Sequence, residues 1–339
     1  MKYVCFGEIM GRINPVGFKR IVQTENFEIT YGGGEANVAV SLANYGKDAA
    51  YVTKMPDNII SQAALRTLKA HNVNVNDVVF GGDRLGLYFV EKGASQRPST
   101  VIYDRKHSAI SEAKREDFDW NKIFKDCCWF HFTGITPALG KNVAEICIDA
   151  CKTAKEKGIK VSCDLNYRAK LWSAKEACET MSKLMEYVDV LIANEEDSEK
   201  VFGISAPDSD VKSGELSKDG YMYVAKALKD RFGIPAVAIT LRKSISASDN
   251  LWSGMLYKDN DFYFSKEYSV HIVDRVGGGD SFGGGLIYAI SENYKNQDII
   301  EFAVAASCLK HSIEGDFNEV SVQEVLKLMN GDGSGRVQR

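Results

Sequence analysis

Short strand-like segments that alternate with longer helical segments constrain the fold of this 339-residue chain more than any other feature of its sequence. Amphipathic stretches such as 143–157 and 174–187 separate segments that are rich in β-branched and aromatic residues. This alternation is typical of stacked β-α-β units, in which helices join parallel strands. We therefore expect an α/β fold with helices on both faces of a mostly parallel sheet, whose strands include residues 3–6, 50–53, 129–132, 160–163, 188–192 and 236–240.

A group of shorter segments interrupts this alternation and predicts a second, smaller sheet. These segments are strand-like, and no helix-length stretch separates the last three of them: 27–31, 78–80, 85–91 and 99–103. We expect an antiparallel lid, formed from about residues 10–34 and 78–107, over the carboxyl ends of the main strands, where open α/β proteins bind ligands. The chain has no linker rich in Pro or Ser and no internal repeat, so we expect residues 1–339 to form one domain.

The charge balance argues against several classes of partner. Lys and Arg total 42 and Asp and Glu total 46, and no long run of one charge occurs. A nucleic-acid or membrane partner is therefore not expected. No apolar run approaches the roughly 20 residues that span a bilayer, and we expect a cytoplasmic protein.

The densest chemical signal is the glycine-rich segment 274–285, which follows a predicted strand at 269–273 and opens a predicted helix at 282–294. Consecutive glycines allow backbone N–H groups to converge at a helix N-terminus and hold an anion. We expect Gly277, Gly278 and Gly279 to form this anion hole, with Asp280 beside it as a base. The alternative is a tight turn in which Asp280 only caps the helix. The last glycines, 283–285, are expected to serve close helix packing.

A second glycine cluster, 32–34, runs from a strand-like segment into an Ala-rich helix. Glycine allows a ligand to approach the backbone, and Asn37 on the first helical turn would point toward that ligand. Tight packing of helix on sheet is the alternative for this cluster. The 274–285 segment lacks the Gly-Lys-Ser/Thr of a Walker loop and comes too late in the chain for a dinucleotide fingerprint.

Together the two clusters resemble the ribokinase family of carbohydrate kinases, also called the phosphofructokinase-B family. The resemblance covers essentially the whole chain, because the family's Asp-x-Asn-x-Arg and Asn-x-x-Glu motifs have counterparts at 164–168 and 194–197. It implies a ribokinase-like three-layer α/β/α fold with a mostly parallel central sheet and a small β-sheet lid. It also implies that Asp280 takes a proton from a sugar hydroxyl while the anion hole holds the transferring phosphoryl group.

The resemblance further implies ATP and Mg²⁺ as cofactors, with K⁺ as a monovalent cation next to the anion hole. Asn194 and Asp197, the latter standing where the family has Glu, would position Mg²⁺ through water, and oxygens of Asp274 and Val276 would ligate K⁺. Many members have a Thr-x-Gly-x-x-Gly turn under the nucleotide where this chain has residues 240–246, so this turn must follow another course here. The residues implied to contact ATP are Asn166, Arg168, Asn194, Thr240, Arg242, Ser244, Gly277 and Gly279.

Two arginines favour a sugar acid as the phosphoryl acceptor. Arginine matches a carboxylate with two parallel hydrogen bonds, and Arg105 and Arg168 both follow predicted strands. A surface ion pair for Arg105 and a contact of Arg168 with ATP phosphate alone are the alternative. Residues 99–109, 166–172 and the tail 334–339 resemble the 2-keto-3-deoxygluconate kinase branch of the family. That resemblance implies a substrate pocket that contains Gly34, Asn37, Tyr88, Tyr103, Arg105, Arg168, Asp280 and Asp316.

The sequence thus predicts ATP-dependent phosphorylation of 2-keto-3-deoxy-D-gluconate at its 6-hydroxyl. A fructokinase or another sugar kinase of the same family stays open, as does an inactive regulatory protein that binds nucleotide or sugar. A dehydrogenase is less favoured, because the chain has no early dinucleotide fingerprint. The gluconate and galactonate epimers are not distinguished, and the turn residue Asp316 could have only a structural role. A homo-oligomer, a dimer through the lid, is expected.

Overall fold

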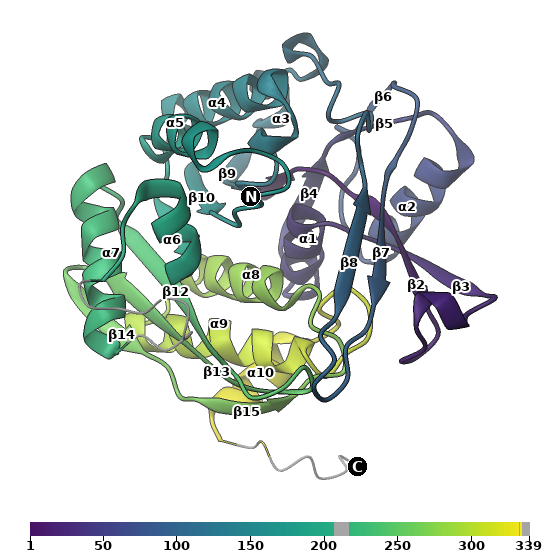
Figure 1. Cartoon of the computed structure of the whole chain (residues 1–339). Coiled ribbons are helices and arrows are strands. Elements are labelled where there is room, and N and C mark those ends of the chain that lie inside the picture. Colours follow the sequence, from purple (N-terminus) through teal and green to yellow (C-terminus); the bar gives the residue numbers. More distant parts are fainter. Residues whose placement is uncertain (207–216, 332, 334–339) are drawn as a thin grey trace.

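The computed structural model describes residues 1–206, 217–331 and 333 (Figure 1). The tail 334–339, which resembles that of the 2-keto-3-deoxygluconate kinase branch, lies outside the described residues. A nine-stranded sheet crosses the molecule, with strands β14-β13-β12-β11-β10-β9-β1-β4 in order and β15 paired with β13. Its strands are β1 (Lys2–Phe6), β4 (Asp48–Val52), β9 (Cys127–Thr133), β10 (Lys160–Asp164), β11 (Val190–Ala193), β12 (Ala236–Ser244), β13 (Asp249–Lys258), β14 (Asp261–Phe264) and β15 (Tyr268–His271).

The strands from β12 to β4 pair in parallel, as the sequence predicts, and β13 to β15 add an antiparallel edge. β1 lies between β4 and β9, so the strand order reverses at β1. Ligands of open α/β sheets bind at the carboxyl ends of the strands next to such a reversal. This topology predicts a ligand site at the carboxyl ends of β1, β9 and β10.

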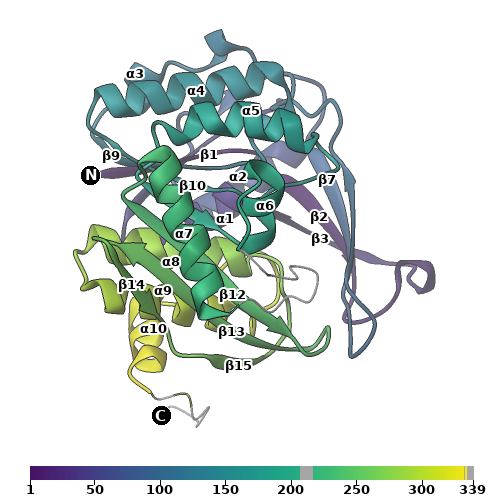
Figure 2. The same ribbon diagram turned by 60° about the vertical axis from the view of Figure 1, so that its left-hand side comes forward.

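Helices cover both faces of the sheet (Figures 1 and 2). Alternate residues of β1 separate the two cores: Tyr3 and Cys5 pack on one face, and Val4 and Phe6 pack on the other. The first face carries α1 (Gly34–Asn44), α2 (Ile59–Ala70), α8 (Gly278–Ser291), α9 (Asn296–Lys310) and α10 (Val322–Met329). The second carries α3 (Trp120–Ile123), α4 (Lys141–Glu156), α5 (Ala174–Met185), α6 (Glu195–Phe202) and α7 (Lys218–Phe232). Within the described residues, no helix combines the length and the apolar character needed to cross a membrane.

Helix α8 begins at Gly278, four residues before the expected start at 282. Gly277 caps it with a left-handed φ of 82°, a conformation that glycine adopts without strain. The later glycines of α8 pack closely on neighbouring helices, as expected. A Cβ on Gly284 would lie 2.6 Å from Cβ of Ser41 in α1. The helix therefore brings its N-terminus, residues 277–280, close to α1.

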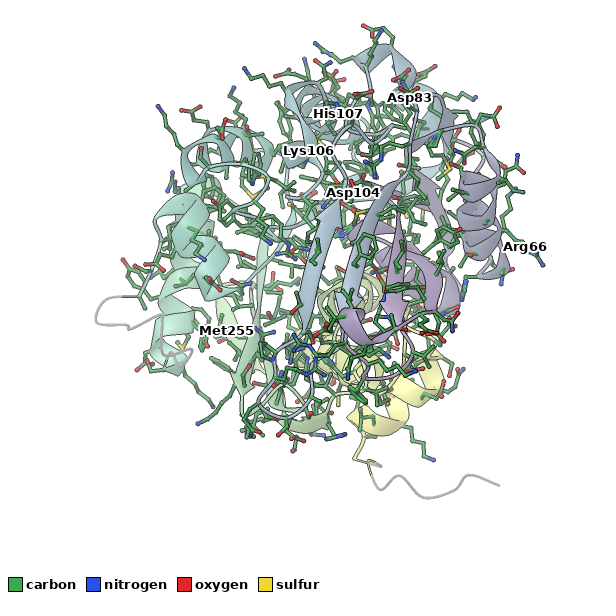
Figure 3. The ribbon with its side chains drawn as sticks, turned by 45° about the vertical axis from the view of Figure 1, so that its right-hand side comes forward. Arg66, Asp83, Asp104, Lys106, His107 and Met255 are labelled. Atoms are coloured by element: carbon green, nitrogen blue, oxygen red, sulfur yellow. The ribbon has the colours of Figure 1, made fainter. Side chains whose placement is uncertain are left out.

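A separate four-stranded sheet, here called the small sheet, has the order β3-β2-β7-β8. Its strands are β2 (Met10–Pro15), β3 (Phe27–Gly32), β7 (Gly86–Glu91) and β8 (Thr100–Asp104). The expectation of a purely antiparallel sheet is wrong, because β2 and β7 pair in parallel. The placement of 78–80 in this sheet is also wrong: β6 (Val79–Phe80) pairs with β5 (Lys54–Met55) in a two-stranded sheet of its own. Figure 3 shows Asp104, Lys106 and His107 where the chain leaves β8 and returns to the body of the molecule.

Candidate active site

A cavity of about 940 Å³ lies between the small sheet and the carboxyl ends of the main strands. That volume is at the upper end of the range for small-molecule sites, so it offers room for two ligands side by side. Most of the site residues predicted from the sequence line it: Gly34, Asn37, Tyr88, Tyr103, Arg105, Asn166, Arg168, Asn194, Asp197, Thr240, Arg242, Ser244, Val276, Gly277, Gly279, Asp280 and Asp316.

The N-terminus of α8 opens into this cavity. In the described chain, the N–H groups of Gly279 and Asp280 have no protein acceptor, and a Cβ on Gly279 would meet no atom within 4 Å. Gly278 differs from the expectation for an anion hole: its N–H donates to the Arg275 carbonyl at 3.3 Å, and it packs against the His311 ring instead of lining the cavity. Two free donors at a positive helix end are suited to hold an anion.

Asp280 stands beside these donors and is oriented by Asn37. The Asn37 side-chain amide donates to Oδ2 of Asp280 at 2.6 Å, and Oδ1 of Asn37 accepts from the Gly33 N–H at 3.2 Å. Burial raises the pKa of Asp280 to about 7; the charges of Asp316 and Glu35 add to this rise, whereas the hydrogen bond from Asn37 opposes it. A carboxylate with a pKa near neutrality is suited to accept a proton during catalysis.

This pKa leads to a prediction for the pH dependence of the reaction. If deprotonated Asp280 is the base, kcat/KM is expected to fall by about tenfold per pH unit below a pH of about 7 and to level off above it. Initial rates at subsaturating acceptor across that range measure the profile. If kcat/KM of the Asp280→Asn variant fell with pH in the same way, a group other than Asp280 would be responsible for the pH dependence.

Two further carboxylates face the same cavity from β10 and α6. Burial raises the pKa of Asp164 well above its usual range, and the charges of Asp197 and Asp280 raise it further. Burial likewise raises the pKa of Asp197 to about 6. Asn194 is the N-cap of α6. Its Oδ1 accepts from the Asp197 N–H, and its Nδ2 donates to Oδ2 of Asp197. Neighbouring carboxylates raise one another's pKa because their negative charges repel. A divalent cation bound near them would offset this repulsion.

Among the described residues, no group of three or more His, Cys, Asp and Glu side chains is arranged to ligate a metal ion directly. Mg²⁺ usually keeps several of its waters and is bound through one or two carboxylates together with phosphate oxygens. Asn194 and Asp197 line the cavity with the oxygen-bearing side chains that Mg²⁺ prefers, and water-mediated positioning by them stays a prediction.

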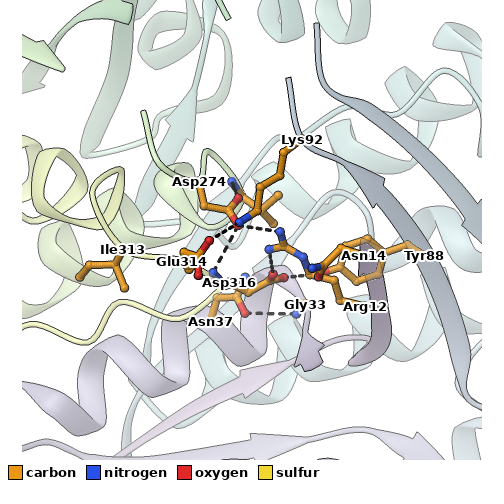
Figure 4. A network of polar contacts seen from close by, with 12 residues as sticks. Arg12, Asn14, Gly33, Asn37, Tyr88, Lys92, Asp274, Ile313, Glu314 and Asp316 are labelled. Atoms are coloured by element: carbon orange, nitrogen blue, oxygen red, sulfur yellow. Dashed lines mark hydrogen bonds and ion pairs between the residues drawn. The ribbon is translucent and has the colours of Figure 1, made fainter. Parts of the chain in front are cut away.

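A buried polar network connects the small sheet to the loop before α8 (Figure 4). Arg12 of β2 is 1% exposed and donates to Oδ2 of Asp274 at 2.6 Å and to Oδ1 of Asp316 at 2.7 Å. The Tyr88 hydroxyl donates to the other carboxylate oxygen of Asp316. Asp316 thus lines the cavity with its carboxylate already held, whereas Asp274 lies behind the cavity wall.

The two arginines expected to bind a substrate carboxylate have different surroundings. Arg105 is 7% exposed and donates through Nε to Oε2 of Glu8 at 2.7 Å, so the alternative of a surface ion pair is wrong. Its guanidinium also lies 5.5 Å from the centre of the Tyr103 ring, and its Nη1 has no protein partner in the described chain. Arg168 is exposed at the rim, where it donates to the Tyr167 carbonyl at 3.1 Å.

The cavity wall at 240–244 is a strand. β12 continues to Ser244 and pairs with β13 through the register Ser244↔Asn250, so the chain turns only afterwards. Arg242 on this strand and Arg275 on the loop before α8 both face the cavity, and burial together with the charge of Arg242 lowers the pKa of Arg275. Two cations at this wall favour a polyanionic ligand such as a nucleotide phosphate.

Residues 1–318 match the sequence profile of the pfkB family carbohydrate kinases. The chain belongs to this family. A crystal structure of 2-dehydro-3-deoxygluconokinase from Thermotoga maritima is similar to this pfkB kinase with a TM-score of 0.94 and 54% identity, over 98% of this chain and 100% of that one. A 2-dehydro-3-deoxygalactonokinase from Haloferax volcanii is 30% identical over 98% of both chains. A putative 2-keto-3-deoxygluconate kinase from Enterococcus faecalis is 25% identical, with a TM-score of 0.91 over 100% and 99% of the chains.

Several charged residues in or near the cavity of this carbohydrate kinase were missed in the sequence, among them Glu8, Arg12, Arg275 and Lys310. Glu8 follows the carboxyl end of the first strand, where the fold predicts ligands, and that position was the available signal; Arg12 lies in β2, the next strand along the chain. Arg275 is a cation inside the glycine-rich segment itself. Lys310, the last residue of α9, gave no signal, because a lysine at a helix C-terminus is ordinary.

Proposed function

We propose that this kinase transfers the γ-phosphoryl group of ATP to the 6-hydroxyl of 2-keto-3-deoxy-D-gluconate, also named 2-dehydro-3-deoxy-D-gluconate. The observation that carries the proposal is a buried arginine, Arg105, that lines the same cavity as a carboxylate with a pKa of about 7, Asp280. One group suits the acid end of a sugar acid, and the other suits the hydroxyl that is phosphorylated. The likeness to kinases named for this sugar acid and for its galactonate epimer supports the same assignment.

In the proposed reaction, Asp280 accepts the proton of the 6-hydroxyl as the oxygen attacks the γ-phosphorus. A new P–O bond forms to the sugar, the bond from the γ-phosphorus to the β,γ-bridging oxygen breaks, and ADP leaves with that oxygen. The free N–H groups of Gly279 and Asp280 stabilise the charge on the transferring group. Asn37 holds the carboxylate of Asp280 toward the acceptor.

ATP and Mg²⁺ are the proposed cofactors. Asn194 and Asp197 would hold Mg²⁺ through water, and the ion would neutralise phosphate charge when bound. A protein of the same fold, a putative Ribokinase II from E. coli, was crystallised in complex with ATP and Mg²⁺. Arg168, Arg242 and Arg275 line the cavity and would bind the nucleotide phosphates.

Replacing Arg105 by Ala is expected to raise KM for the sugar acid by roughly 10- to 100-fold, the value of one charge-assisted hydrogen bond, with little change in KM for ATP. Arg84→Ala is the matched control, because Arg84 pairs with the exposed Asp104 near the cavity but does not line it. Steady-state kinetics with each substrate varied in turn measures both constants. A rise in KM for ATP alone would reassign Arg105 to the nucleotide.

ADP release in the presence of 2-keto-3-deoxygluconate, 2-keto-3-deoxygalactonate, fructose, ribose and gluconate tests the proposed substrate. The galactonate epimer is a second candidate, because a relative at 30% identity carries that name. The expected order of kcat/KM places 2-keto-3-deoxygluconate first. Higher turnover with fructose would make the chain a fructokinase, and binding without turnover on all five sugars would make it a regulatory protein.

We also propose that the enzyme is a dimer through the small sheet. Cross-strand pairing places Ile29, Ile13, Phe89 and Ile102 in one row. Arg12 and Tyr88 alternate with this row and contact Asp316 at the cavity, so the row is on the outer face. Ile29 and Ile102 are each more than half exposed. A second copy of the chain that packs on this row would cover it.

Light scattering on a sizing column is expected to give the mass of two chains for the wild type and of one chain for Ile102→Asp. Ile59→Asp is the matched control, because Ile59 is an exposed isoleucine on α2 outside the row. A monomeric wild type at micromolar concentration would contradict the proposed dimer.

A further inference from the structure

The predicted K⁺ site does not fit the contacts that the structure gives to Asp274. Oδ2 of this carboxylate accepts from Arg12 at 2.6 Å and from the Gly315 N–H at 3.2 Å, and Oδ1 accepts from the Val276 N–H at 3.1 Å. The ammonium of Lys92 lies 3.9 Å away. Both oxygens of Asp274 therefore accept hydrogen bonds from the chain itself, and one of these donors is the guanidinium of Arg12.

A second fixed cation, Lys310, lies directly behind the anion hole. Lys310 is 0% exposed, and its ammonium donates to the Ile313 carbonyl at 3.0 Å. A Cβ on Gly277 would lie 3.2 Å from Cε of Lys310, which places this side chain against the residue that caps α8. Lys310 has no role in the proposed reaction, and a buried lysine is costly unless nearby acceptors and negative charges compensate it.

The charges around Lys310 account for its burial. Burial lowers its pKa, and the carboxylates of Asp274, Asp316 and Asp280 oppose that fall, whereas Arg12 adds to it. Arg12 and Lys310 thus form a pair of internal cations between the loop 274–280 and the turn that holds Asp316. A free K⁺ at this place would have to lie beside two fixed positive charges with Asp274 already engaged.

We infer that Lys310 and Arg12 provide, from the chain itself, the positive charge that K⁺ was expected to provide next to the anion hole, so that this kinase turns over without a monovalent cation. The charge acts through the loop that presents the N–H groups of Gly279 and Asp280, and Lys310 is accordingly a positioning residue. The inference rests on the kinase activity of the family but not on which sugar is the acceptor.

The first test compares the wild type in KCl, NaCl and tetramethylammonium chloride at one ionic strength, with every other alkali cation removed. kcat is expected to agree within about twofold among the three salts, for whichever sugar of the panel is turned over. Calorimetric titration with Mg-ATP in the same salts gives a readout that needs no sugar, and the Kd is expected to be equal. Activation by K⁺ of tenfold or more, or ATP binding only in K⁺, would overturn the inference.

The second test removes the charge with Lys310→Met, which keeps the length of the side chain. kcat is expected to fall by roughly 10- to 100-fold, somewhat less than the loss of a direct donor to the transition state, with a much smaller change in KM for ATP. Lys54→Met is the matched control, because Lys54 is a largely buried lysine that pairs with Asp117 and does not line the cavity. A thermal melt with Mg-ATP verifies that each variant is folded and binds nucleotide.

The truncation Lys310→Ala extends this test by leaving space for a replacement cation. Added K⁺ or ammonium is expected to restore part of its kcat, whereas the wild type and Lys54→Met show no such response. A wild-type kcat in Lys310→Met would overturn the inference whatever the acceptor sugar. Absence of turnover by the wild type on every sugar of the panel would instead contradict the proposed substrate, and the ATP titration would still decide the cation question.

Discussion

Asp280→Asn is expected to lower kcat by roughly 10²- to 10⁴-fold, the range for loss of a general base. The amide keeps the size of the carboxylate and can still accept the hydrogen bond from Asn37, but it cannot take the proton of the 6-hydroxyl. Because burial already raises the pKa of Asp280, removal of its charge is not expected to destabilise the fold. Initial rates at saturating ATP and sugar measure kcat, and a urea melt measures the free energy of unfolding.

Asp298→Asn is the matched control for this prediction. Asp298 occupies the first turn of α9 as Asp280 occupies that of α8, but it lies outside the cavity. The control is expected to keep the wild-type kcat. If Asp280→Asn kept more than a third of the wild-type kcat, Asp280 would not be the base.

Gly277→Ala is the second substitution with a large expected effect. The new Cβ would stand 2.0 Å from the carbonyl oxygen of Asp316 and 3.2 Å from Cε of Lys310, so the loop before α8 must move. The N–H groups of Gly279 and Asp280 would then be misplaced, and we expect kcat to fall by about 10²-fold or more. The left-handed φ of 82° adds about 1–2 kcal/mol of strain to the folded state.

The Gly158→Ala variant tests the effect of backbone strain alone, without displacement of the loop before α8. Gly158 has a similar φ of 69°, no atom lies within 4 Å of its Cβ position, and the residue follows α4 away from the cavity. Its variant is expected to lose about 1–2 kcal/mol of unfolding free energy in urea and to keep the wild-type kcat. Equal kcat values for the two variants would show that the position of this loop does not control the reaction.

The fold was predictable because local sequence patterns determine its main parts. The parallel strands follow from hydrophobic segments of strand length between amphipathic helices. A helix after the glycine-rich segment was also predictable, although α8 begins at Gly278, four residues before the predicted start. The strand 78–80 was misplaced, since a short apolar segment does not specify its partner: here backbone pairing with Lys54–Met55 decides it.

The site was only partly predictable, because its least visible members are defined by partners far along the chain. Arg105 was predicted as a ligand of the substrate, but its pairing with Glu8 joins residues 97 positions apart and has no local pattern. In the sequence, Lys310 is an ordinary lysine at the end of a helix. Only its burial beside Gly277 indicates an electrostatic role. Motifs identify residues that touch a ligand, whereas the charges that support them emerge from tertiary packing.

The ion pairs of Arg12 also have a consequence for the order of folding. Arg12 belongs to the second strand of the chain, yet its partners Asp274 and Asp316 lie 262 and 304 residues later. During synthesis from the N-terminus, this guanidinium has neither partner until almost the whole chain has been made, and burying it earlier would leave an uncompensated charge. β2 can therefore reach its final packing only after the C-terminal helices have docked. The active site is therefore completed only in the last steps of folding.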